Sequence, residues 1–310
     1  MISFVLKPTP PFRLDLTVWA LRRRPENQID WWENGAYRRV LPVDETSTQI
    51  EIRQLSSSDA PRLSVQINCE QESPELQRSV TVAIERLLGI RLNLQAFYDF
   101  AAHEPKLGSL ARRFRGMRPP RFLTGFECLT NAIACQQLSL AAGIQILNRF
   151  SRAFGTPFGS GEGRQFAFPR PQDLMDAETG DLFRLGFSRQ KSMALLELAR
   201  SIRAGAFDLE SLYSLPDDVC VAKLCRLRGI GRWSAEYTLL RGLGRLHVFP
   251  GDDVGAVNNL KQWLGLSEDL DYDRVRHTLS RWKPFGGLIY LHLLLEKIAK
   301  GGHVEPSMAS

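Results

Sequence analysis

The spacing of apolar residues changes near residue 95, and this change does most to limit the folds open to the chain. Before it, four short segments alternate apolar with polar residues, as half-buried β-strands do. They are residues 12–19, 36–41, 48–52 and 62–68. After it, apolar residues recur every three or four positions, which is the period of amphipathic helices. We therefore predict an antiparallel sheet followed by a helical region.

One helix is expected to pack on the sheet. It begins at Ser73-Pro74, a helix-start signal, and carries its leucine, valine and isoleucine residues along one face. The predicted fold class is α+β. We expect an N-terminal antiparallel β-sheet domain with a packed helix over residues 1–100, and an all-helical domain over residues 101–300. Residues 301–310 are expected to form a tail.

The composition is that of an ordinary globular protein, with 44% hydrophobic and 24% charged residues. No run approaches the roughly 18 apolar residues of a membrane span, and the N-terminus lacks the basic start and apolar core of a signal peptide. We therefore expect a cytoplasmic protein with no membrane partner. The net charge of +6, from 40 Lys and Arg against 34 Asp and Glu, weakly favours an anionic partner such as nucleic acid.

The cysteines and histidines argue against metal or disulfide chemistry. The five cysteines lack paired spacing, so a disulfide framework is not expected. No cysteine follows Cys225, which leaves too few ligands for a C-terminal iron–sulfur cluster. The five histidines are scattered, and none lies at zinc-ligand spacing from a cysteine or another histidine. No cofactor is therefore expected to be required.

The most informative stretch is Leu227 to Ala235, in which Gly229 and Gly231 lie between two helical segments. A short glycine-rich turn lets main-chain N–H groups point outward at the start of the next helix, where they can hold a phosphate. Such a contact involves only the backbone, so it would not depend on DNA sequence. The alternative is a tight helix–turn–helix connection whose glycines only relieve strain.

Two carboxylates follow some twenty residues later. Asp252 and Asp253 come after a Pro250-Gly251 turn and precede a predicted helix. Either carboxylate could cap that helix, since aspartate is a favoured N-cap residue. A carboxylate could equally stabilise positive charge that develops on a sugar when a glycosidic bond breaks.

These blocks together resemble a known family. LRGIGRWSAEY, followed by LRG and FPGDDV, is similar to the helix–hairpin–helix DNA glycosylases, and specifically to the AlkA-like 3-methyladenine DNA glycosylase II branch. FECLTNAIACQQLSLAA and RWKPF agree in register. The blocks are residues 126–142, 227–237, 240–242, 249–254 and 281–285. The resemblance spans residues 112–295, places the hairpin at about residues 222–236, and extends more weakly to the sheet region.

The resemblance implies a base excision repair enzyme that flips a damaged base out of duplex DNA and hydrolyses its N-glycosidic bond. Alkylated purines such as 3-methyladenine and 7-methylguanine are the implied substrates. Asp253 falls on the family's catalytic aspartate, and we expect Asp252 to be the helix cap or a supporting group. Trp233 stands where strand-cutting relatives have a Schiff-base lysine, which implies a monofunctional enzyme that leaves an abasic site.

The remaining site residues are likewise carried over by position. The base pocket is expected to be lined by Trp233, Tyr237, Gln136 and Trp19. DNA contacts are expected from Gly229, Gly231, Arg232, Ser234 and Gln137, of which Gln137 would fill the gap left by the flipped nucleotide. A monovalent cation, Na⁺ or K⁺, is implied at the main-chain oxygens of Cys225, Leu227 and Ile230.

Two positions depart from the family pattern. Leu294 stands where AlkA-like enzymes have a pocket tryptophan, and Ala20 falls near a pocket phenylalanine, with Trp19 beside it as a substitute. These changes put the range of lesions in doubt, although not the reaction. The run Arg22 to Arg24 could contact DNA, but charge runs more often form solvated faces.

Three other interpretations stay open at this point. The chain could be a non-catalytic protein that binds damaged DNA, a glycosylase for hypoxanthine, uracil or oxidised guanine, or a helical scaffold with incidental basic charge. The expected partner is damaged double-stranded DNA, and a monomer suits an enzyme that scans it.

Overall fold

The computed structural model describes residues 1–43, 46–69 and 72–307. Its five-stranded antiparallel sheet has the order β1-β5-β4-β3-β2. The strands are β1 (Ile2–Leu6), β2 (Trp31–Glu33), β3 (Ala36–Val43), β4 (Thr46–Gln54) and β5 (Leu63–Asn68). Three of the four predicted strands are therefore present, as β3, β4 and β5. A small hairpin of β6 (Pro157–Phe158) and β7 (Gln165–Phe166) lies outside this sheet.

The remaining prediction for a strand, at residues 12–19, is wrong. Those residues lie mainly in helix α1 (Leu14–Arg22), and nearly every residue of α1 is buried. A helix without a solvent-exposed face need not carry polar residues at a 3.6-residue period. The alternation of apolar and polar residues here resembles that of a strand only by chance. The helix that begins at Ser73 is α2 (Pro74–Leu88), and the hydroxyl of Ser73 accepts the N–H of Leu76 as its cap.

The rest of the chain is helical, which confirms the predicted fold class of a sheet followed by a helical region. The helices are α3 (Gln95–Ala102), α4 (Pro105–Arg113), α5 (Gly125–Cys135), α6 (Leu140–Phe154), α7 (Thr179–Arg184), α8 (Arg189–Arg203), α9 (Asp217–Leu224), α10 (Arg232–Thr238), α11 (Val254–Leu264), α12 (Tyr272–Leu279) and α13 (Gly286–Lys300). A π-helical turn, Leu239–Leu243, continues α10. No helix in the described part of the chain is both long and apolar enough to cross a membrane.

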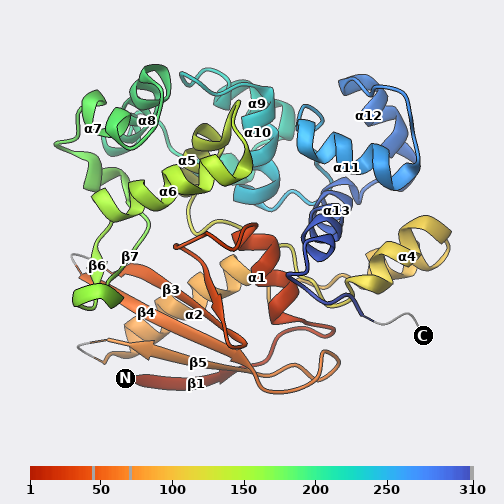
Figure 1. Cartoon of the computed structure of the whole chain (residues 1–310), viewed down its shortest axis with the longest axis horizontal. Coiled ribbons are helices and arrows are strands. Elements are labelled where there is room, and N and C mark those ends of the chain that lie inside the picture. The colour runs from red at the N-terminus through yellow and green to blue at the C-terminus, as the bar shows by residue number, and fades with distance from the viewer. Residues whose placement is uncertain (44–45, 70–71, 308–310) are drawn as a thin grey trace.

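Figure 1 shows the sheet and α2 at one end of the molecule and helices α5 to α12 at the other, with α1 and α13 between them. Three apolar cores follow this division. One lies between the sheet, α1 and α2, a second joins α5, α6, α8 and α10, and a third surrounds α13.

A buried charge network joins the sheet to the helices. Arg39 of β3 is fully buried and donates to Asp30 at 2.7 Å and to both carboxylate oxygens of Glu127 on α5 at 2.7 and 2.8 Å. Burial raises the pKa of Glu127, which Arg39 opposes. Removal of one member of such a network leaves charge buried without compensation, so each member is needed.

We expect Arg39→Met to lower the free energy of unfolding by about 3–5 kcal/mol, because it leaves two carboxylates buried together. The neighbouring Arg38 pairs with Glu51 and Glu33 near the surface, so Arg38→Met should cost less than about 1 kcal/mol. Urea unfolding of both variants measures the difference. Equal losses in the two variants would contradict the role of the buried network.

Candidate active site

The hairpin between α9 and α10 is the first part of the site. Gly229 has a φ of +73°, and a Cβ at this position would lie 2.9 Å from the Cβ of Ala194. Glycine is therefore required at residue 229 by both backbone conformation and space. Gly231 is extended and occupies the N-cap position of α10, with open space where a Cβ would stand. The N–H groups of the first turn of α10 have no partner within the helix, so they are available to an anion.

Arg232 and Ser234, two predicted DNA contacts beside this turn, make contacts within the protein. Arg232 donates to both oxygens of Asp252, at 2.7 and 3.0 Å, and its guanidinium lies 3.6 Å from the centre of the Tyr272 ring. Ser234 is buried, and its hydroxyl accepts a hydrogen bond from Gln136. A contact from Ser234 to DNA would therefore have to use its main chain.

Glu236 of α10 fixes the turn before α11 through two hydrogen bonds. One of its carboxylate oxygens accepts the N–H of Gly251 at 3.1 Å and the other accepts the hydroxyl of Tyr272 at 2.5 Å. Burial raises the pKa of Glu236. A Cβ on Gly251 would lie 2.6 Å from the Tyr272 ring, so no larger residue fits there. These contacts fix the position of the two carboxylates that follow.

Asp253, and not Asp252, caps α11, which corrects the expectation from the sequence. The Oδ1 of Asp253 accepts the N–H of Ala256 at 2.9 Å. Its Oδ2 accepts the indole N–H of Trp233 at 3.2 Å and the hydroxyl of Tyr290 at 3.0 Å. Asp252 is instead engaged by Arg232. The cap and the predicted catalytic carboxylate are therefore the same side chain.

Two stacked aromatic rings, those of Trp233 and Tyr237, adjoin Asp253. The rings of Trp233 and Tyr237 stack with their centres 5.6 Å apart. Tyr237 is buried, and its hydroxyl accepts a hydrogen bond from Arg23 at 2.9 Å. Arg23 is buried as well and also donates to Asn131, so it is not a solvent-facing DNA contact.

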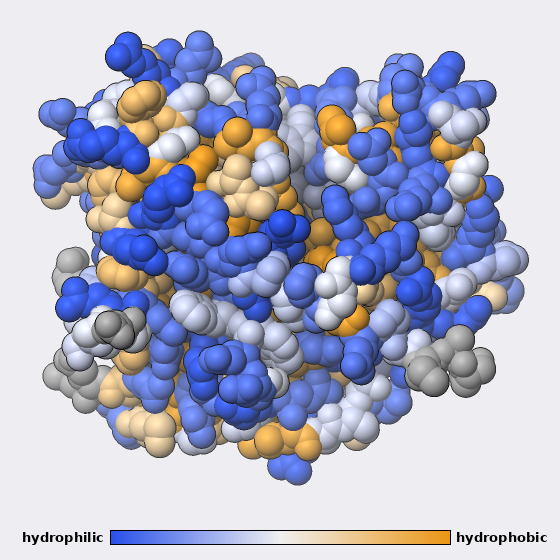
Figure 2. All heavy atoms as spheres, in the orientation of Figure 1, coloured by the Kyte–Doolittle hydropathy of each residue, from blue (hydrophilic) through white to orange (hydrophobic). Residues whose placement is uncertain are grey.

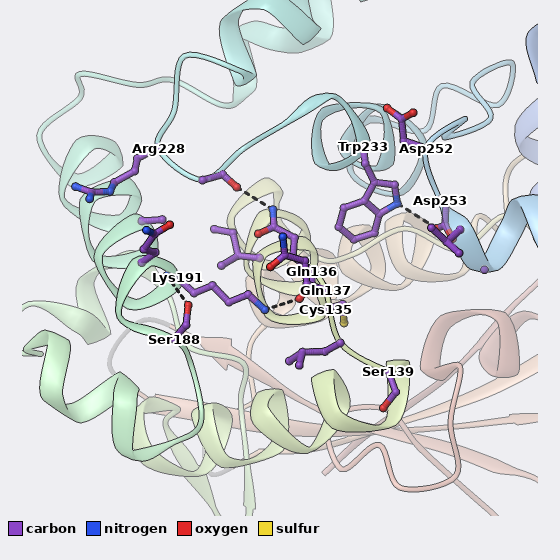
Figure 3. Close-up of a pocket in the computed structure, with 17 residues that line it drawn as sticks. Cys135, Gln136, Gln137, Ser139, Ser188, Lys191, Arg228, Trp233, Asp252 and Asp253 are labelled. Atoms are coloured by element: carbon purple, nitrogen blue, oxygen red, sulfur yellow. Dashed lines mark hydrogen bonds between the residues drawn. The ribbon is translucent and has the colours of Figure 1, made fainter. Parts of the chain in front are cut away.

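A cavity of about 650 Å³ opens in front of Trp233 and Asp253. Figure 3 shows these two side chains on one side, Lys191 and Arg228 on the other, and Gln136 and Gln137 between them. Figure 2 shows a mainly hydrophilic face on this side of the molecule, with apolar residues visible in the hollow between the α9–α10 side and the α11–α12 side.

Two predicted pocket residues do not line this cavity. Tyr237 lies behind Trp233, and Trp19 lies elsewhere, stacked on His303 with ring centres 4.8 Å apart. Trp19 belongs to the apolar core around α13, because helix α1 packs that face against α13. Leu294 packs against the same core, and Ala20 is fully buried.

The loop between α5 and α6 contains both predicted glutamines. The side chain of Gln136 donates to the main-chain oxygen of Gly229 and to the hydroxyl of Ser234, both at 2.8 Å. The ammonium of Lys191 donates to the main-chain oxygen of Gln136 at 2.6 Å, and burial lowers the pKa of Lys191. Gln137 is exposed with a φ of +54°. Gln136 therefore ties this loop to the hairpin, and Gln137 is left at its tip.

Sequence reasoning missed Tyr290, Glu236 and Lys191. Tyr290 lies one helical turn before Leu294 on α13. The helical period could therefore have placed it on the same face as Leu294, which stands at a pocket position of the family. The contacts of Glu236 with Gly251 and of Lys191 with the loop after α5 join distant segments, and no local pattern marks them.

Known proteins that resemble this chain are DNA repair proteins. Residues 130–284 match the family model described as HhH-GPD superfamily base excision DNA repair protein, and residues 3–124 match the AlkA N-terminal domain. The chain is 25% identical to the putative DNA-3-methyladenine glycosylase YfjP of Bacillus subtilis, over 92% of this chain and 96% of that protein. It is 26% identical to DNA-3-methyladenine glycosylase 2 of Escherichia coli, over 94% of this chain and 96% of that protein.

A solved structure has the same fold along nearly the whole chain. The 3-methyladenine DNA glycosylase of Archaeoglobus fulgidus superposes with a TM-score of 0.82 at 24% identity, and the match covers 96% of this chain and 98% of that one.

We expect Gln136→Asn to lower the free energy of unfolding by about 1–3 kcal/mol, because the shorter side chain cannot reach Gly229 and Ser234 and two hydrogen bonds are lost. Gln137→Asn is the matched control and should change stability little, since Gln137 is exposed and asparagine tolerates a positive φ. Thermal unfolding of both variants without DNA measures this. A loss in Gln137→Asn as large as in Gln136→Asn would contradict the tie to the hairpin.

Proposed function

The chain belongs to the HhH-GPD superfamily of base excision DNA repair proteins, and from this membership we propose that it is a monofunctional DNA glycosylase for alkylated purines. In this proposal it binds damaged duplex DNA, flips the modified base out of the stack, hydrolyses its N-glycosidic bond and leaves an abasic site. One observation carries the proposal. Asp253 stands at the edge of a cavity that the hairpin glycine Gly229 also lines.

Asp253 is assigned the central chemical role. When the bond from sugar to base breaks, positive charge develops on the sugar ring, and a fixed carboxylate beside C1′ stabilises it. Its three hydrogen-bond donors hold the carboxylate in one orientation before the substrate arrives. Such preorganisation lowers the barrier because the protein need not rearrange during the reaction.

Alkylated purines suit this arrangement. Alkylation at N3 of adenine or N7 of guanine makes the base cationic and a good leaving group, so little general-acid assistance is needed. The indole face of Trp233 at the cavity edge can attract such a cation. The substrates proposed are 3-methyladenine, 7-methylguanine and related lesions.

DNA is held, in the proposal, through phosphate contacts to the main chain around Gly229 and Gly231, with Gln137 entering the gap in the duplex. The proposal also includes a Na⁺ or K⁺ ion, bound by the main-chain carbonyl oxygens of Cys225, Leu227 and Ile230. Leu227 already accepts the N–H of Ile230 at 3.2 Å, and its second lone pair fits a cation ligand. The protein acts as a monomer in this proposal.

Asp253→Asn should lower the single-turnover rate of base release by at least about 100-fold while leaving DNA affinity within a few-fold. Asparagine still caps α11, so the fold should persist. The measurements are release of 7-methylguanine from alkylated duplex DNA and binding to a duplex with a tetrahydrofuran abasic analogue. Near-wild-type release by the variant would refute the role of Asp253. No release by the wild type, with release from a hypoxanthine or uracil duplex, would move the proposal to that lesion.

Borohydride added during turnover should trap no covalent adduct between protein and DNA, because Trp233 offers no amine. Lys191 is an amine in the same cavity, but its ammonium is engaged by two main-chain oxygens. Denaturing electrophoresis of labelled DNA measures trapping. A trapped adduct that disappears in Lys191→Gln would show a lyase reaction through Lys191 and overturn the monofunctional assignment.

A further inference from the structure

Tyr290 of α13 makes the one hydrogen bond to the Asp253 carboxylate that comes, within the described part of the chain, from outside α10 and α11. Its hydroxyl donates to Oδ2 at 3.0 Å, and its ring packs edge-on against Phe249 with ring centres 5.6 Å apart. We propose that Tyr290 is a positioning residue, which fixes the plane of the Asp253 carboxylate. This inference rests on the proposed role of Asp253 in excision.

The donors on Asp253 determine which edge of it can face a substrate. A carboxylate has about four lone-pair positions. Trp233 and Tyr290 use both positions of Oδ2, and the N–H of Ala256 uses one of Oδ1. The remaining lone pair is therefore on Oδ1. Without the hydroxyl of Tyr290, a second free position would open on Oδ2 and the carboxylate could rotate or accept a water there.

The surroundings keep the free edge of Oδ1 open. A Cβ on Gly255 would lie 3.3 Å from Oδ1, and Gly255 and Asp253 both line the cavity. Glycine at residue 255 therefore leaves room beside the one oxygen that still has an unused lone pair. The sugar of the extruded nucleotide would approach from this side, and Tyr290 holds the opposite oxygen.

The hydroxyl of Tyr290 remains protonated under working conditions. Burial raises its pKa well above the usual value of 10.0, and the adjacent charge of Asp253 raises it further. A phenol that does not ionise donates its hydrogen bond across the neutral and acidic range. It therefore holds the Oδ2 of Asp253 at every pH in that range.

Other charged and titratable groups lie around this contact. Arg23 and Arg241 interact electrostatically with Tyr290 and stay charged. Burial raises the pKa of Tyr237 and of the Cys135 thiol, so neither ionises in the acidic range. Asp252 is exposed and paired with Arg232.

The test is Tyr290→Phe, which removes the hydroxyl and keeps the ring. The environment of the Asp253 carboxylate is followed directly, without DNA, by NMR of ¹³C-labelled aspartate, with the carboxyl resonance assigned from Asp253→Asn. We expect this resonance to move in Tyr290→Phe, because the carboxylate loses one of its three hydrogen-bond donors. On 7-methylguanine duplexes, the single-turnover rate at pH 7 should fall roughly tenfold, while binding to the duplex with the abasic analogue should stay within a few-fold.

One control separates positioning from packing. Tyr37 is a fully buried tyrosine whose hydroxyl donates to a carboxylate, that of Asp30 at 2.8 Å in the sheet region. Tyr37→Phe should lower stability without moving the Asp253 carboxyl resonance or lowering the rate of base release.

The outcomes are distinct. An unchanged Asp253 carboxyl resonance in a folded Tyr290→Phe overturns the inference, as does an equal change in Tyr37→Phe. If Tyr290→Phe does not fold, Tyr290→Leu, which also lacks the hydroxyl and is no larger than tyrosine, takes its place under the same criteria. Because the NMR measurement needs no substrate, failure of the wild type to excise any base would refute the proposed function while the contact could still be judged.

Discussion

The site depends on one carboxylate that satisfies two demands at once. The Oδ1 of Asp253 caps α11, and its Oδ2 receives donors from α10 and α13, through Trp233 and Tyr290. Three helices that are distant in sequence therefore meet at a single side chain. A cap that was only structural would be free to rotate toward water. Here the opposite oxygen is held as well, so the requirements of the helix and of the cavity fix the same orientation.

The position of Asp253 is set in turn by buried polar contacts that link the parts of the molecule. Glu236 holds the turn before α11, and Gln136 ties the loop after α5 to the hairpin. Arg39 joins the sheet to α5 through Glu127. Hydrogen bonds at the two ends of α5 therefore join this helix to the sheet and to the hairpin. In a buried setting such groups specify geometry because an unpaired member is costly.

The two parts of the fold and the Gly229–Gly231 turn could be predicted from local sequence patterns, because residue periodicity and glycine spacing act over a few residues. Asp253 was singled out by the resemblance to the family, whereas the local pattern left both Asp252 and Asp253 as possible caps. The predictions that fail depend on packing across the fold, which local patterns do not show. Helix α1 was mistaken for a strand because it is buried on all sides, and Trp19 was assigned to the cavity although α1 turns it toward α13. Tyr290 and Glu236 act through contacts across the fold, which a single sequence does not reveal.

Two buried arginines, Arg23 and Arg241, interact with the tyrosines next to Asp253. Arg23 and Arg241 are buried, and their hydrogen-bond acceptors are neutral: Tyr237 and Asn131 for Arg23, and the main-chain oxygen of Ala20 for Arg241. Both guanidiniums interact with Tyr290, the residue that donates to Asp253. In the proposed reaction, DNA covers the cavity and removes water that would otherwise stabilise the charge of the Asp253 carboxylate. Fixed positive charge needs no solvent, so in that proposal the two buried arginines take over part of this stabilisation.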